Sequence, residues 1–158
     1  MIMEPTPSKA ANRVSLNRSL LAIVIGIFFL TLNLKQELLS QKILALQLIL
    51  AIPLFTISML AYSKVGYRKE IKGWNILGWV TFTFGYAFLF NVIGILVGEF
   101  IGVTLALAFF ATSWILMLIY SFVDINYNKS VIKERIIKDS LFILIQLLLG
   151  VFVVIGLI

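Results

Sequence analysis

Residues 74–123 read WNILGWVTFTFGYAFLFNVIGILVGEFIGVTLALAFFATSWILMLIYSFV, and this stretch decides the fold. Its 50 residues contain a single charge, that of Glu99. One straight helix of this length would reach about 75 Å at 1.5 Å per residue, whereas the hydrocarbon core of a bilayer is about 30 Å thick. The stretch therefore predicts two membrane spans, 74–97 and 103–123, joined as a hairpin at 98–102.

Three further apolar segments extend this hairpin into a bundle. They lie at 19–34, 43–63 and 140–158. Residues 1–18 carry two prolines, several polar residues and three basic residues, which favours a flexible basic leader on the cytoplasmic side. The predicted fold class is an all-α integral membrane protein in which residues 19–158 form a bundle of about five transmembrane helices.

The composition agrees with a lipid environment. Hydrophobic residues make up 61% of the 158 residues and charged residues 13%, and the mean hydropathy is +1.09. These values lie outside the range of soluble domains. The net charge of +6 does not indicate nucleic-acid binding, because most basic residues lie before or between apolar runs.

The distribution of basic residues predicts the orientation. The leader and the 64–73 and 124–139 connections hold eleven Lys and Arg residues, whereas the 35–42 connection holds two and the remaining turn and the carboxyl end hold none. Lys and Arg accumulate in cytoplasmic loops. We therefore expect a multi-pass protein of the cell membrane with a cytoplasmic amino terminus and an external carboxyl terminus.

Small residues recur at four-residue spacing in Gly94-x3-Gly98-x3-Gly102. On a continuous helix they would form a smooth face for close helix packing. In the hairpin, Gly98 and Gly102 instead serve the turn and Gly94 alone belongs to a packing face. We favour the turn, with helix contact as the first alternative and a substrate path as the second.

Glu99 is the candidate functional carboxylate of the hairpin. As a turn residue it would be exposed, and this is the interpretation we favour. As a carboxylate embedded in the membrane domain it would be costly to bury and could handle protons or cations, with Asn91 or a neighbouring helix as its most natural partner. Tyr86 and Asn91 are candidates for a weakly polar path or for helix contacts.

The 124–139 connection is a candidate surface for anionic lipids. Its basic side chains Lys133, Arg135 and Lys138 would face the headgroups, where each contributes about 1 kcal/mol. Glu134 and Lys138 are spaced to form an i,i+4 ion pair if this part is helical. An interfacial helix leading into the last span is expected.

Enzyme chemistry receives little support from the sequence. The chain has no Cys and no His, so thiolate nucleophiles and imidazole bases are absent, and we expect no metal site and no cofactor. Asp124 begins a segment like a calcium loop, but Lys129 occupies the position that needs glycine.

Two classes of function remain. The first is a non-catalytic accessory or structural subunit of a membrane complex, which packs against other subunits or itself within the lipid bilayer. The alternative is a small transporter or channel, oligomeric because five spans make a thin bundle, with a polar path near the third and fourth spans. No nucleic-acid partner is expected.

Overall fold

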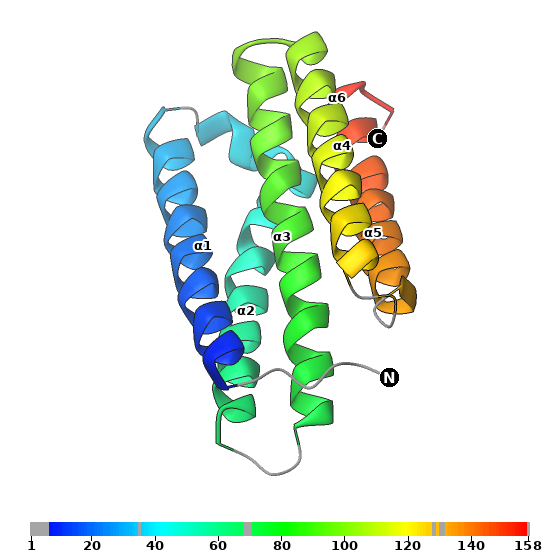
Figure 1. Ribbon diagram of the computed structural model, residues 1–158. Coiled ribbons are helices and arrows are strands. Elements are labelled where there is room, and N and C mark those ends of the chain that lie inside the picture. The colour runs from blue at the N-terminus through cyan, green and yellow to red at the C-terminus, as the bar shows by residue number, and fades with distance from the viewer. Residues whose placement is uncertain (1–6, 35, 68–70, 128, 130–131, 158) are drawn as a thin grey trace. The chain divides into compact units, whose positions relative to one another are not determined.

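The computed structural model describes residues 7–157 except 35, 68–70, 128, 130 and 131, and this part of the chain is helical with no strand. The elements in chain order are α1 (Pro7–Leu34), η1 (Gln36–Ser40), α2 (Lys42–Val65), α3 (Lys72–Phe100), α4 (Val103–Tyr127), α5 (Ile132–Gln146), η3 (Leu147–Val151) and α6 (Phe152–Val154). Figure 1 shows them along the chain. The expected all-α class is confirmed.

Five helical stretches are long and apolar enough to cross a membrane. They are Ser8–Asn33, Lys42–Val65, Lys72–Phe100, Val103–Tyr127 and Ile132–Val154. They cover the five expected apolar segments, except that Leu34 of the first segment and the described residues 155–157 of the fifth lie outside these stretches. The helices begin earlier or end later than the apolar runs, because hydropathy marks solvent preference and does not mark where backbone hydrogen bonding stops.

The first helix begins before the expected boundary at Ser19. Residues 7–18 form the first turns of α1, whereas the sequence suggested a flexible leader. Alanine, lysine and arginine in this segment are good helix formers, and Ala10 is buried against Tyr62 and Val65 of α2. Packing on α2 thus accounts for the order. Residues 1–6 of the leader lie outside the described residues.

The hairpin lies where residues 74–123 required it. α3 ends at Phe100 and α4 begins at Val103, so the chain reverses over Ile101 and Gly102. Gly102 has φ +136°, a backbone conformation that residues other than glycine rarely adopt. The turn is therefore shorter than the five residues expected, and Gly98 remains helical.

The last helical stretch begins in the polar connection. α5 starts at Ile132 and continues through a π-helical turn, η3, into α6. The expected interfacial helix is thus not a separate element. The π turn adds one residue to a single turn and widens the helix there. Such π turns within α-helices are frequent at functional sites.

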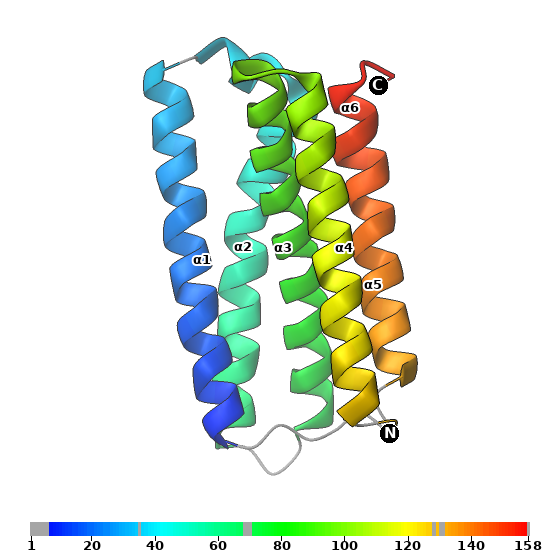
Figure 2. The ribbon, with the colours of Figure 1, turned by 45° about the horizontal axis from the view of Figure 1, so that its top comes forward.

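The described residues divide into two compact units within α3, an amino-terminal unit up to Leu89 and a carboxy-terminal unit from Phe90 onward. In the amino-terminal unit, α1 runs beside α2 in both views (Figures 1 and 2). Ser58 Oγ donates a buried hydrogen bond of 2.8 Å to the carbonyl of Gly78, which ties α2 to α3. A Cβ added at Gly85 would lie 3.3 Å from the Phe55 ring, so α2 and α3 approach closely there.

The carboxy-terminal unit has an aromatic core. The Phe90 ring stacks on Phe109 at 5.6 Å between centroids and meets the edge of Phe142 at 6.0 Å. Phe109 in turn meets Phe110 at 5.7 Å. These rings come from α3, α4 and α5, so aromatic contacts of a favourable offset or edge geometry join all three helices of this unit.

Candidate functional site

The residues of the candidate polar path lie in different units. Tyr86 belongs to the amino-terminal unit, where its ring is half-buried and stacks on Phe82 at 5.5 Å with an interplanar angle of 12°. Asn91 belongs to the carboxy-terminal unit and is fully buried. Each therefore has its own surroundings.

Glu99 lies in the last turn of α3 and is exposed. Gly98 precedes it on the same helix, where an added Cβ would meet Ala106 and Val154 at ordinary contact distances of 3.5 Å. Gly102 forms the turn itself. The three residues thus occupy one end of the hairpin.

Gly94 belongs to a second group of residues, in the interior of this unit. We call Asn91, Gly94, Phe110 and Gly150 the Phe110 cluster. An added Cβ at Gly94 would lie 2.6 Å from Phe110 Cε2 and closer still to Cζ, and one at Gly150 would lie 2.8 Å from Cζ. The ring of Phe110 is 1% exposed, so it is held between two glycines on two helices. No methyl group fits on either side of it without a shift.

Asn91 connects this cluster to the π turn. Its Nδ2 donates to the carbonyl of Ile145 at 3.4 Å, and its Oδ1 would be only 2.5 Å from a Cβ at Gly150. Ile145 lies in the last turn of α5, directly before the π turn that contains Gly150. Gly150 lets Asn91 reach that region of the last helix.

A second polar contact crosses the same unit one turn away. Trp114 Nε1 on α4 donates to Gln146 Oε1 at 2.5 Å, and Gln146 is fully buried at the end of α5. Interhelical hydrogen bonds of this kind contribute about 0.6 kcal/mol on average within membrane domains. Together with Asn91, this pair fixes how the last helix is rotated against α3 and α4.

The side chains around the Phe110 cluster are suited to helix packing and not to catalysis. Asn, Gln and Trp side chains neither titrate near neutral pH nor act as nucleophiles. In the part of the chain that the structure describes, no three carboxylates come together. The Phe110 cluster can hold three helices in close contact.

Three residues of this interior were not identified from the sequence. They are Phe110, Trp114 and Gly150. Gly150 is the first of two glycines in the apolar run that begins at Leu147, and an isolated glycine in such a run is a signal for a close approach. Nothing in the sequence indicates that its neighbour is Phe110, forty residues earlier.

The three basic residues proposed as a lipid surface differ in their surroundings. Arg135 Nε lies 2.6 Å from Asp124 Oδ2, and the guanidinium lies over the Tyr120 ring, 4.7 Å from its centroid. Lys138 forms the expected i,i+4 ion pair with Glu134. Lys133 is exposed. Two of the three cations are thus partly neutralised by carboxylates.

The amino-terminal unit contains a basic network that the sequence did not suggest. Arg13 on α1 donates to Tyr62 Oη at 2.9 Å and to Asn75 Oδ1 at 3.4 Å. Its guanidinium also lies over the Tyr62 ring, 4.8 Å from the centroid. Arg13 therefore joins α1, α2 and α3, and it explains why the first turns of α1 are tied to the rest of the unit.

No protein-family model, curated protein or solved structure matches this chain.

Proposed function

We propose that the chain crosses the cell membrane five times as a non-catalytic accessory or structural subunit, and that it acts by packing against other subunits or a second copy of itself. Five long apolar helices support the membrane position. The eleven basic residues in alternate connections support a cytoplasmic amino terminus and an external carboxyl terminus.

The observation that carries the packing role is the uncovered face of α4. Only 11% of the apolar stretch of α4 is buried, compared with 56% in α3. The buried residues Ala106, Phe110 and Ser121 lie on one side of α4. At 100° per residue, the exposed residues Thr104, Ala108 and Thr112 fall on the opposite side. Small exposed side chains at this spacing allow another helix to approach closely.

Enlarging this face is the test of the packing role. Ala108→Leu should shift the tagged chain to a smaller complex on native gels after gentle solubilisation of native membranes, because the bulkier side chain keeps a partner helix away. Ala22→Leu is the matched control, since Ala22 is exposed on α1. A wild-type chain that already migrates alone would contradict the proposal.

Permeation is the competing function, and one observation favours it. Gln146 Nε2 is buried and has no hydrogen-bond partner among the described residues, which is unusual for an amide. The filled space around Phe110 argues against a path at that level. Ion or solute flux through the purified chain in liposomes, above that of empty liposomes, would favour permeation over packing.

The proposed orientation makes a direct prediction. A reporter fused after Ile158 should be active only outside the cytoplasm, and one inserted in 64–73 only inside, because the basic connections stay cytoplasmic. Paired reporters of opposite compartment dependence measure this. A cytoplasmic carboxyl terminus would require an even number of crossings and would contradict the five-span arrangement.

A further inference from the structure

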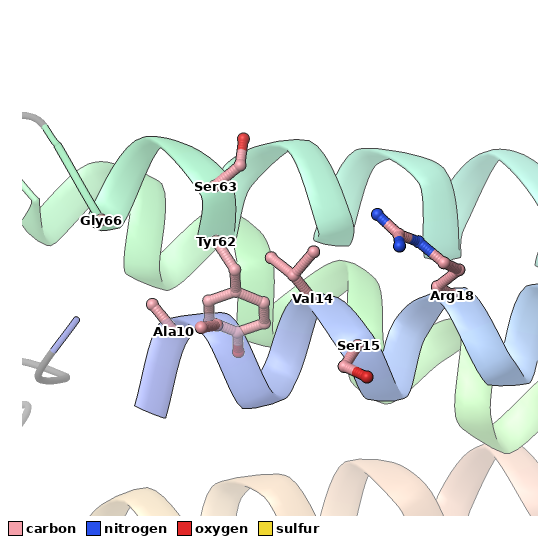
Figure 3. A pocket seen from close by; sticks show the side chains of 8 residues that line it. Ala10, Val14, Ser15, Arg18, Tyr62, Ser63 and Gly66 are labelled. Atoms are coloured by element: carbon pink, nitrogen blue, oxygen red, sulfur yellow. The ribbon is translucent and has the colours of Figure 1, made fainter. Parts of the chain in front are cut away.

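A groove of about 380 Å³ lies between α1 and α2 of the amino-terminal unit. Figure 3 shows it with Tyr62 pointing from α2 onto α1 and Arg18 extending from α1 toward α2. Its lining combines small residues with polar ones, among them Ala10, Ala11, Ser15, Arg18, Ser63 and Gly66. The small side chains leave the space, and the polar ones give it a hydrophilic rim.

Arg18 is the cation of this groove that is available to a ligand. It is exposed, and it has no hydrogen bond or ion pair among the described residues. Arg13, one turn earlier, is instead occupied by Tyr62 and Asn75. The planar guanidinium of arginine can offer two parallel donors to a phosphate.

The groove has a positive field with little to offset it. Lys9, Arg13 and Lys64 lie on the same turns of α1 and α2 as the groove residues. Glu37 is the one acidic residue that the structure describes in this unit, and it lies in η1, beyond the other end of α1. An anion in the groove would therefore meet cations and no described carboxylate.

An apolar strip continues from Arg18 along α1. Ala22 and Gly26 follow at four-residue spacing, so they lie on the same face, and both are exposed. A Cβ at Gly26 would have nothing within 4 Å. No charged residue follows Arg18 within α1. A cation at the head of a shallow apolar strip matches a molecule with an anionic head and a hydrocarbon tail.

We propose that this groove binds an anionic phospholipid, with Arg18 donating to the phosphate and an acyl chain lying over Ala22 and Gly26. The inference rests on the proposed membrane position. In that position Arg18, the last charged residue of α1, lies at the level of the lipid headgroups on the cytoplasmic side. The lipid would occupy the groove as a bound molecule, in addition to general attraction of the leaflet for basic residues.

Native mass spectrometry of the full chain in mild detergent tests this with dioleoylphosphatidylglycerol as the probe. Arg18→Gln should weaken its binding about fivefold or more, the equivalent of one cation near an anionic surface. Ala11→Leu should also weaken binding, because Ala11 is exposed and lines the groove, so the larger side chain fills it without changing charge. Lys42→Gln is the charge-matched control, because Lys42 is exposed at the end of α2 opposite the groove, and this change should alter binding less than about twofold.

Several results would overturn the inference. Equal weakening by Arg18→Gln and Lys42→Gln would mean general attraction, and equal binding of dioleoylphosphatidylcholine would mean that the headgroup charge is not recognised. Displacement of the lipid by millimolar inorganic phosphate would assign the groove to a free anion. Membrane position is checked separately: a chain that alkaline carbonate removes from membranes would refute the proposed function, whereas a retained chain without lipid selectivity would refute the groove alone.

Discussion

Gly94→Ala should lower the free energy of unfolding by about 1–3 kcal/mol, the cost of overpacking a filled interior. The new Cβ would lie 2.6 Å or less from the Phe110 ring, and Phe110 cannot retreat because Gly150 closes its other side. Alanine is a better helix former than glycine by about 1 kcal/mol, so the steric cost must exceed this gain. Unfolding by SDS in mixed micelles, followed by tryptophan fluorescence, measures the change.

Two alanine substitutions serve as controls for this experiment. Gly98→Ala places its Cβ at ordinary contact distances, and Gly26→Ala meets nothing within 4 Å, so both should leave stability unchanged or raise it by up to about 1 kcal/mol. Phe110→Leu should recover part of the loss in Gly94→Ala, because it removes the ring atoms that clash. A loss as large in Gly98→Ala would show that general small-residue packing, and not the contact with Phe110, sets the effect.

Length and hydropathy were sufficient to predict the five long helices, but not where they begin and end. Residues 74–123 had to form two helices because no single crossing is 50 residues long, and glycine near the middle gave the chain a place to reverse. The turn consists of Ile101 and Gly102, so of the two glycines Gly98 and Gly102 only Gly102 is needed for the reversal. Sequence spacing could not distinguish them, because a helical glycine and a turn glycine look alike in the chain.

The contacts between helices were not predictable, because they depend on rotation about each helix axis. Asn91 was identified as a polar residue within a predicted span, yet nothing in the sequence indicates that its amide bonds to the Ile145 carbonyl on another helix. The same holds for Phe110, whose two glycine neighbours lie on different helices. Hydropathy reports how much of a helix avoids water and does not report which neighbour it faces.

The basic residues illustrate the same limit for function. The charge count treated Arg13, Arg18 and Arg135 alike as signals of orientation. In the structure Arg13 binds Tyr62 and Asn75, and Arg135 pairs with Asp124. Arg18 alone of these three lines a groove without a described partner. An arginine that joins helices is therefore distinguished from one that can bind a ligand by its hydrogen-bond partners and its exposure, and both are known only from the structure.

Gly102→Ala should destabilise the hairpin by about 1–3 kcal/mol, the cost of holding a residue with a Cβ in a sparsely populated backbone region. At φ +136° the backbone lies well beyond the left-handed helical region near +57°, so asparagine should not rescue it either. A Cβ at Gly102 would meet nothing within 4 Å, which makes the effect purely conformational.

The control for this strain is Gly66→Ala at the end of α2, where φ is −69° and the nearest atom to a new Cβ is 3.4 Å away. Its unfolding free energy should change by less than about 0.5 kcal/mol. Inserting a glycine after Ile101 in the Gly102→Ala chain should restore stability, because a longer turn no longer forces the alanine to positive φ. If Gly102→Ala unfolds like the wild-type protein in SDS titrations, the turn does not depend on glycine at this position, and the chain reverses with another backbone conformation.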